Sequence, residues 1–290
     1  MRIDLEATRK VVTKALDLGI TLFDTADIYG NKGGSETMLG QVLGERRKDI
    51  VLATKFAGPM VEGKTRRDAS RRYIMTAVEA SLRRLQTDWI DLYQLHFADP
   101  RTPMEETLGA LDDLIRQGKV RYIGCSNLPA WQTVDAEWIA CEHGLHRFIS
   151  TQDEYSLLVR DVEAEKIPAA QAYGMGLLPY FPLASGMLTG KYKRGVEAPA
   201  GTRFASIPSL ANRYTTDANW ALVEKLEAFC AQRGHALLEL AFSWLLARSP
   251  VASVIAGATK PEQLEANVKA ADWTLTPEDL AEIDRLRGQS

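Results

Sequence analysis

Residues 90–127 read IDLYQLHFADPRTPMEETLGALDDLIRQGKVRYIGCSN and contain a complete strand–helix–strand pattern. The stretch opens and closes on short apolar runs, Ile90 to Leu95 and Val120 to Ile123. Continuous apolar runs of this length are typical of strands that are buried on both faces, as in parallel sheets. Because parallel strands need a long crossover connection, the segment between the runs is expected to form a helix.

The helix between these two runs has marked ends. Thr102 is the predicted N-cap, Pro103 suits the first turn, Glu105 completes a capping box, and Gly118 ends the helix. Its apolar positions recur at helical spacing and predict one buried stripe, formed by Met104, Leu108, Leu111 and Ile115.

The same alternation of strand and helix extends through the chain. Further strands are predicted at Ile20 to Phe23, Ile50 to Ala53, Phe148 to Thr151, Leu177 to Tyr180 and Val251 to Ile255. One helical stripe is formed by Ile74, Val78, Leu82 and Leu85, and two later helices begin at Pro261 and Pro277, the second after Thr276. The apolar segment around residues 237–245 is predicted to be deeply buried, whereas residues 186–215 have no clear period and are expected to form a functional flap.

Alternating strands and helices predict an α/β fold with a parallel sheet, either a closed barrel or an open doubly wound sheet. The barrel is favoured, because a dinucleotide-binding open sheet would place a G-x-G-x-x-G turn after a strand. Gly174 and Gly176 precede a strand instead. At 290 residues, the chain fits one TIM-type (β/α)8 domain over residues 1–290.

The amino-acid composition limits the classes of binding partner that are expected. The formal net charge of -3 arises from 35 basic and 38 acidic residues without a basic stripe, so neither nucleic acid nor a membrane surface is an expected partner. Small neutral or anionic ligands are compatible with this charge. The three cysteines, Cys125, Cys141 and Cys230, are too few and too far apart for a disulfide framework or a metal site. With no apolar run of membrane-spanning length and a charged first segment, a cytoplasmic protein is expected.

Polar residues stand just beyond the predicted strands, where a β/α barrel carries its chemistry. In chain order these residues are Asp24, Tyr29, Lys55, His96, Ser126, Asn127, Gln152 and Tyr180. Taken singly, each has a simpler explanation. Asp24 could cap a turn, Lys55 could be a solvated loop end, His96 could pack in the core, and the Tyr29 ring could serve packing alone.

Together, four of these residues describe a proton donor. A tyrosine hydroxyl has a pKa near 10, and a neighbouring ammonium such as Lys55 stabilises tyrosinate and lowers that pKa. Asp24 is predicted to pair with Lys55, and His96 to donate a hydrogen bond to a substrate carbonyl oxygen beside Tyr29. This combination is suited to polarising a carbonyl group.

Eight segments carry a resemblance to a known family. They are FDTADIYG (23–30), ATKF (53–56), LYQLH (92–96), GCSN (124–127), TQDEYSLL (151–158), YFPLASG (180–186), LTGKY (188–192) and IAGATKPEQLEANV (255–268). In this order, from about Leu5 to the C-terminus, the chain resembles the aldo-keto reductase superfamily, in particular the bacterial members related to the potassium-channel β subunits. The resemblance implies that Asp24, Tyr29, Lys55 and His96 form the catalytic tetrad.

The resemblance also implies a bound nicotinamide nucleotide. It assigns Ser126, Asn127 and Gln152 to the carboxamide, with Tyr180 stacked on the nicotinamide ring. Phosphate binding is expected after the last strands and at a helix N-terminus. The predicted residues there are Leu183, Ser185, Gly257, Ala258, Thr259 and Lys260, with Gln263 and Asn267 toward the adenosine end. Lys260 is the expected partner of a 2′-phosphate, which favours NADPH over NADH.

The resemblance has one gap, because about forty residues that family members carry before the helix near Leu5 are missing here. They form a hairpin and the first barrel strand, and a barrel without that strand has two unpaired edges. We therefore expect either a start upstream of Met1 or a rearranged barrel, with poor solubility or low activity for the chain as written.

Three functions follow from these observations. The leading hypothesis is NADPH-dependent reduction of a small aldehyde or ketone, with Tyr29 as general acid. The alternatives are an NADPH-binding regulatory subunit with little turnover, and a Schiff-base lyase that uses Lys55. A carboxylate beside Lys55 argues against the lyase, because it keeps the amine charged.

Overall fold

The computed structural model describes residues 3–60 and 67–288, which fall into two compact units. Residues 3–60, 67–153 and 163–178 form the first, here called the sheet unit, because all six strands of the sheet belong to it. Residues 154–162 and 179–288 form the second, here called the C-terminal unit. The prediction of a single domain stays a prediction.

The sheet unit contains a parallel sheet whose strands neighbour one another in chain order. The strands are β1 (Leu22–Asp24), β2 (Val51–Phe56), β3 (Ile90–Leu95), β4 (Val120–Ser126), β5 (Phe148–Gln152) and β6 (Gly176–Leu177). Asp24 pairs in register with Ala53, Lys55 with Gln94, and Ser126 with Gln152. The carboxyl ends of the strands, which carry the candidate site residues, therefore lie next to one another at the same end of the sheet.

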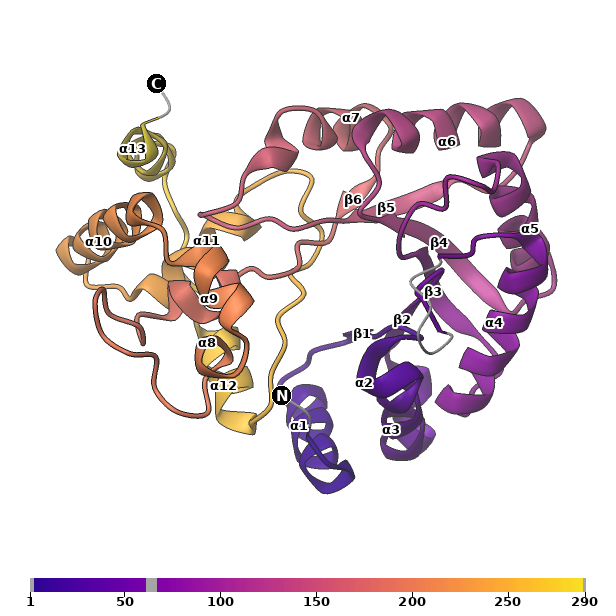
Figure 1. The fold of residues 1–290 in the computed structure, drawn as a ribbon, viewed down its shortest axis with the longest axis horizontal. Helices are drawn as coiled ribbons and strands as arrows, with labels where there is room; N and C mark the ends of the chain where they lie inside the picture. The colour runs from indigo at the N-terminus through magenta and orange to yellow at the C-terminus, as the bar shows by residue number, and fades with distance from the viewer. Residues whose placement is uncertain (1–2, 61–66, 289–290) are drawn as a thin grey trace. The chain divides into compact units, whose positions relative to one another are not determined.

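Helices connect these strands, as the alternating pattern predicted. They are α1 (Leu5–Asp17), α2 (Tyr29–Lys32), α3 (Gly34–Leu43), the 3₁₀ helix η1 (Gly44–Asp49), α4 (Arg71–Leu85), α5 (Met104–Arg116), α6 (Ala130–His143) and α7 (Lys166–Ala172). Within the sheet unit, α4, α5 and α6 follow one another along the outer side of the sheet (Figure 1).

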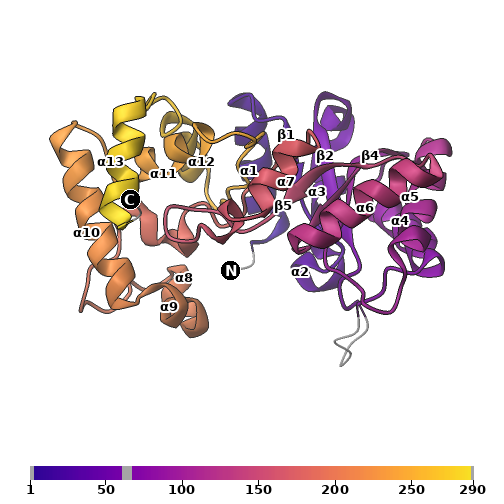
Figure 2. The same cartoon turned by 90° about the horizontal axis from the view of Figure 1, so that it is seen from above.

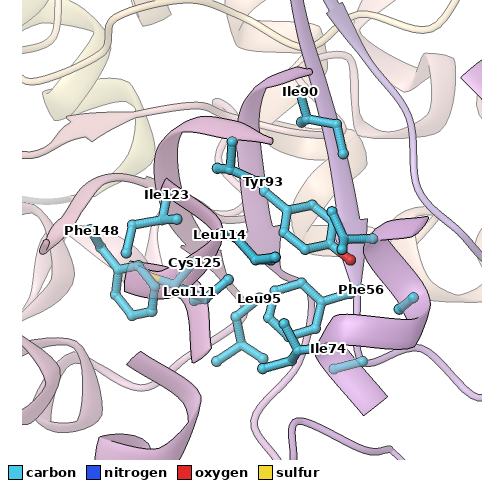
Figure 3. Packing of buried hydrophobic residues seen from close by; sticks show 14 of the residues in the cluster. Phe56, Ile74, Ile90, Tyr93, Leu95, Leu111, Leu114, Ile123, Cys125 and Phe148 are labelled. Carbon is cyan, nitrogen blue, oxygen red and sulfur yellow. The ribbon is translucent and has the colours of Figure 1, made fainter. Parts of the chain in front are cut away.

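The core of the sheet unit lies between the strands and these outer helices. Figure 3 shows Phe56 and Tyr93 from neighbouring strands beside Ile74 of α4, with Leu111 and Leu114 of α5 against the next strands. Each of these five residues is fully buried. Burial of such side chains contributes roughly 1.5–3 kcal/mol each, so the apolar stripes predicted for α4 and α5 hold the helices on the sheet.

The C-terminal unit is mainly helical. Its elements are the 3₁₀ helix η3 (Ala184–Thr189) and α8 (Arg203–Ser206), α9 (Pro208–Tyr214), α10 (Asp217–Gln232), α11 (Leu237–Leu246), α12 (Pro261–Lys269) and α13 (Pro277–Arg287), labelled in Figure 2 except for η3. A further 3₁₀ turn, η2, spans Asp161–Glu163. The predicted burial around residues 237–245 is confirmed by Trp244 and Leu245, and both helix starts at proline are confirmed, with Thr276 as N-cap.

Two predicted strands differ from the structure. β6 ends at Leu177 rather than Tyr180, because Pro179 has no backbone N–H to continue a ladder. The predicted strand at Val251 to Ile255 is wrong: in the described chain its two end residues are isolated bridge residues, and Ile255 is bridged to Tyr180 through the Ile255 N–H and the Pro179 carbonyl at 2.9 Å.

Two further predictions need correction. Thr102 does not cap α5, because its hydroxyl donates to the Asp99 carboxylate at 2.9 Å, and Pro103 is the N-cap residue. The segment 186–215, predicted to be an irregular flap, contains α8 and α9 and the end of η3. These helices have four to seven residues, which is too short to produce a visible hydrophobic period.

Close packing between α3 and α4 depends on Gly40. A Cβ atom at Gly40 would lie 2.4 Å from the carbonyl oxygen of Arg84 and 2.7 Å from the carbonyl carbon of Leu85. Nearby, the buried Glu36 carboxylate pairs with the Arg84 guanidinium at 2.6 Å and accepts the Thr54 hydroxyl at 2.6 Å. The two helices therefore approach backbone to backbone beside a buried ion pair.

We predict that Gly40→Ala lowers the free energy of unfolding by about 1–3 kcal/mol, because the new methyl group overlaps backbone atoms that cannot move independently. Gly109→Ala in α5 is the matched control, since nothing lies within 4 Å of its Cβ position. The control is expected to gain up to about 1 kcal/mol from helix propensity. Urea unfolding measures both, and equal effects would contradict the assigned contact.

Candidate active site

The four predicted catalytic residues come from three consecutive strand ends of the sheet unit. Asp24 is the last residue of β1, and Tyr29 is the first residue of α2. Lys55 lies near the end of β2, and His96 directly follows β3. The backbone ties these ends together, because the His96 N–H donates to the Phe56 carbonyl at 3.0 Å.

The predicted ion pair between Asp24 and Lys55 is present. Lys55 Nζ donates to Asp24 Oδ2 and also to the Thr25 carbonyl, the latter at 2.9 Å. The Lys55 side chain is fully buried and that of Asp24 is 5% exposed. A buried ammonium costs several kcal/mol unless it is paired and hydrogen-bonded, so Asp24 and Thr25 fix both the charge and the position of Lys55.

The second oxygen of Asp24 accepts hydrogen bonds from two glutamine amides. Gln152 Nε2 lies 2.9 Å and Gln94 Nε2 3.1 Å from Asp24 Oδ1. Gln94 is fully buried and was not among the predicted site residues. Its signal in the sequence is a polar side chain within an apolar run, two residues before His96 and therefore on the same face of β3. These contacts hold the Asp24 carboxylate in one orientation.

Tyr29 lies against the ion pair through its ring. Lys55 Nζ is 5.0 Å from the Tyr29 ring centroid, a cation–π distance. Loss of water around the Tyr29 hydroxyl raises its pKa above 10, while Lys55 lowers the pKa and Asp24 raises it by a smaller effect. The expected effect of Lys55 is therefore present, but the predicted net lowering is wrong, because desolvation outweighs the ammonium.

His96 packs edge-on against Tyr29, with ring centroids 5.6 Å apart and planes at 83°. Burial, together with the positive charges of Lys55 and Arg67, lowers the pKa of His96 to about 3. The imidazole is therefore neutral at physiological pH. Within the described residues its buried Nδ1 atom has no hydrogen-bond partner.

Ser126, Asn127 and Gln152 lie together at the ends of β4 and β5. The Ser126 hydroxyl donates to the Gln152 carbonyl at 2.8 Å, and the Asn127 N–H donates to the same carbonyl at 3.2 Å. Asn127 Nδ2 reaches the His96 carbonyl at 3.1 Å, which joins this group to the tetrad. Asn127 has a φ of 56°, a conformation that asparagine adopts more readily than most residues.

The first group of predicted cofactor residues in the C-terminal unit surrounds the turn from Tyr180 to Ser185. Tyr180 forms isolated parallel bridges with Glu154 and Ile255, and its ring stands edge-on to Phe181. Leu183 directly precedes η3. Ser185 has a φ of 58° and a buried hydroxyl oxygen that has no partner among the described residues.

The second group lies at the start of α12. Gln263 Oε1 accepts the Thr259 N–H at 2.7 Å and the Lys260 N–H at 3.2 Å, so Gln263 caps the helix. Lys260 is exposed, and Asn267 lies one turn beyond Gln263. Gly257 and Ala258 precede this cap, and the Arg203 guanidinium lies 3.9 Å from the Cβ position of Gly257. Arg203 was not predicted, since it lies on a short helix far away in the sequence.

These residues fit a nicotinamide nucleotide. The unpartnered Ser185 hydroxyl, the Arg203 guanidinium and the N-terminus of α12 suit phosphate oxygens, which are anionic acceptors. In the sheet unit, the Ser126 and Asn127 group offers amide and hydroxyl atoms that suit a carboxamide. Within the C-terminal unit the donor set thus matches an anionic group, and within the sheet unit it matches an amide group.

Comparison with known proteins identifies the family. The family model described as "Aldo/keto reductase family" matches residues 1–287. The chain therefore belongs to the aldo/keto reductase family, as its sequence motifs predicted.

Individual relatives include oxidoreductases and a channel-related protein. The chain is 37% identical to "Uncharacterized oxidoreductase YrpG" of Bacillus subtilis, over 96% of this chain and 86% of that protein. It is 35% identical to "L-glyceraldehyde 3-phosphate reductase" of Escherichia coli K12, over 97% and 84%. It is also 38% identical, over 98% and 85%, to a Schizosaccharomyces pombe protein named as a candidate voltage-gated potassium channel subunit beta.

Fold, motifs and family agree on one class of activity. The protein is an oxidoreductase of the aldo/keto reductase family that reduces carbonyl compounds with a nicotinamide cofactor. Within the described residues, no helix combines the length and the apolar composition that crossing a bilayer requires.

A second buried carboxyl group lies beside the tetrad. Asp27 is 1% exposed, and its Oδ2 atom accepts the Tyr73 hydroxyl at 3.2 Å. Its Oδ1 atom is buried without a partner among the described residues. Burial and the nearby Glu36 carboxylate raise the pKa of Asp27 from 3.8 to about 7.

We predict that Asp27→Asn becomes more stable relative to the wild type as the pH rises. Between pH 4 and 7 native Asp27 keeps a proton that the unfolded chain releases, so the wild-type free energy of unfolding falls across this window. Asparagine has no such proton. From pH 5 to pH 8 the difference between variant and wild type should grow by about 3 kcal/mol in urea unfolding. Exposed Asp17→Asn is the control, and a constant difference for Asp27→Asn would refute the assignment.

Proposed function

We propose that the protein reduces an aldehyde or ketone to an alcohol with NADPH, and that Tyr29 is the general acid. The observation that carries this proposal is the position of the buried Asp24–Lys55 pair against the Tyr29 ring, with neutral His96 packed edge-on against the same ring. This is a protonated phenol beside a fixed positive charge, which is the requirement for delivering a proton to a developing alkoxide.

The bound cofactor would supply the hydride, and the protein supplies the proton and its control. The raised pKa of Tyr29 keeps the phenol protonated at neutral pH, ready to donate. As the proton leaves, the Lys55 ammonium stabilises the phenolate, because opposite charges attract. Asp24 keeps that ammonium in place throughout.

His96 serves this reaction as a neutral donor. A neutral imidazole has one N–H, which can donate to the substrate carbonyl oxygen and hold it beside the Tyr29 hydroxyl. A charged imidazolium would compete with Lys55 for the same region. The low pKa of His96 therefore favours positioning of the carbonyl over proton transfer by His96 itself.

We propose cofactor-binding residues for each unit separately. Ser126, Asn127 and Gln152 would hold the carboxamide and Tyr180 the face of the ring, with Leu183, Ser185 and the segment Gly257 to Lys260 on the phosphates. Gln263 and Asn267 would lie toward the adenosine. Arg203 joins this set on the strength of its position beside Gly257.

The fold proposal is a (β/α)8-type barrel. Six parallel strands in sequential order, joined by helices that pack on one side of the sheet, support it, and so does membership of the family. We further place the protein in the cytoplasm, in line with its free cysteines.

The central test is Tyr29→Phe, which should lower kcat for a simple aldehyde by about 100-fold to 10,000-fold while NADPH still binds. Phenylalanine keeps the ring and loses only the hydroxyl. Activity is followed at the nicotinamide absorbance band, and binding by quenching of protein fluorescence. Exposed Tyr122→Phe is the matched control. Unchanged reduction by Tyr29→Phe would remove Tyr29 from the mechanism.

Cofactor choice is tested with Lys260→Ala. Loss of this exposed cation should raise the Kd for NADPH by about 10-fold or more and leave the Kd for NADH almost unchanged, because only NADPH carries a 2′-phosphate. Lys269→Ala, at the other end of α12, controls for the change in net charge. Equal weakening of both nucleotides by Lys260→Ala would contradict the role in discrimination.

A nucleotide-binding regulatory subunit remains the second function on this fold, because one relative has a channel-related name. The intact Asp24, Lys55 and His96 arrangement favours turnover instead. Single-turnover oxidation of bound NADPH by an aldehyde separates the two. Oxidation at an ordinary enzymatic rate supports the reductase, and bound NADPH that stays reduced supports the regulatory subunit.

A further inference from the structure

Arg67 places an unneutralised positive charge beside the tetrad. It lies on the segment between β2 and α4, and its guanidinium carbon is 4.4 Å from the centroid of the Phe97 ring. The residue is exposed, and no acidic side chain among the described residues forms an ion pair with it. An arginine in this state has its fork of N–H donors available to a ligand.

A row of stacked rings connects this charge to the reacting groups. The Phe97 ring stacks on the His96 imidazole, with centroids 4.2 Å apart and planes at 14°. His96 in turn contacts Tyr29 edge-on. Arg67 is thus two rings away from the position proposed for the substrate carbonyl, and its charge is felt at the His96 imidazole.

The backbone of Arg67 is held by a hydrogen bond that does not involve its guanidinium group. Arg101 Nη2 donates to the Arg67 carbonyl at 2.6 Å. Two carboxylates of the same region have other donors, since Asp68 accepts the Ser70 hydroxyl and Asp99 accepts Arg101 Nε. The backbone of Arg67 is therefore fixed by Arg101, and its guanidinium packs on the Phe97 ring.

We propose that Arg67 binds the anionic group, phosphate or carboxylate, of a short aldehyde or ketone whose carbonyl oxygen lies between Tyr29 and His96. This inference rests on the proposed function and adds the substrate class. A guanidinium recognises both anions through paired N–H donors. Because the guanidinium already packs on the Phe97 ring, little side-chain freedom is lost on binding.

The test compares charged and uncharged substrates of similar size. We would measure kcat/KM for 4-oxobutanoate against butanal, and for glyceraldehyde 3-phosphate against glyceraldehyde, with the wild type, Arg67→Gln and Arg67→Lys. Arg71→Gln is the matched control, because Arg71 is an exposed arginine of the same region that pairs with Asp113. All these substitutions are at exposed positions, so folding should be unaffected.

We expect the wild type to have a higher kcat/KM for the anionic member of at least one pair. A preference in the first pair identifies a carboxylate site, and a preference in the second pair identifies a phosphate site. Arg67→Gln should lower kcat/KM for that anion by about 10-fold to 100-fold and leave the uncharged aldehyde within about twofold. Arg67→Lys should retain part of the preference, and raised salt should weaken it in both the wild type and Arg67→Lys but not in Arg67→Gln. Arg71→Gln should behave as the wild type.

Two results would overturn the proposal. One is a wild type without preference for either anion, and the other is an Arg67→Gln variant that loses charged and uncharged substrates equally. If the wild type reduced none of the four aldehydes, the proposed function would fail separately. Calorimetric binding of the two anions to NADPH-loaded Tyr29→Phe, with and without Arg67→Gln, would then decide whether Arg67 is an anion site.

Discussion

The buried contact between Lys55 and Asp24 is the interaction on which the site depends. Lys55 is fully buried at the end of a central strand, where an unpaired ammonium would be too costly to keep charged. Asp24 on the neighbouring strand neutralises it, and the Thr25 carbonyl accepts a second hydrogen bond from the ammonium. Since β1 and β2 are paired in register at this point, the sheet itself sets the distance between the two charges.

The two oxygens of Asp24 have different neighbours, and this difference is chemically useful. One oxygen contacts the ammonium, and the other accepts neutral amide donors from Gln94 and Gln152. Amides orient the carboxylate without adding charge, so the pair keeps its balance of one positive and one negative group. A second cation in place of either glutamine would oppose the desolvation that raises the pKa of Tyr29, but it would leave a buried excess of positive charge.

Much of this arrangement was predictable from local sequence, and the failures have physical causes. β3 has the predicted bounds, because a parallel strand that is buried along its whole length is largely apolar. Asp24, Lys55 and His96 were found because strand ends are fixed by the same runs. Gln94 and Arg203 were missed, because their contacts depend on which strands and loops become neighbours in space. The prediction of Thr102 as an N-cap was wrong for a similar reason, because the Thr102 hydroxyl donates to the Asp99 carboxylate instead.

The pKa of Tyr29 shows why residue types alone do not determine a proton donor. Lys55 was correctly expected to lower that pKa, yet desolvation and Asp24 together raise it above the ordinary value. A raised pKa makes the phenol a weaker acid, and it also ensures that every molecule at neutral pH carries the proton. Tyr29 gives up its proton only when negative charge develops on the carbonyl oxygen, because that charge makes proton transfer favourable. The Lys55 ammonium then stabilises the tyrosine phenolate that is formed. The resting site is therefore matched to the charge distribution of the transition state rather than to an ionised tyrosine.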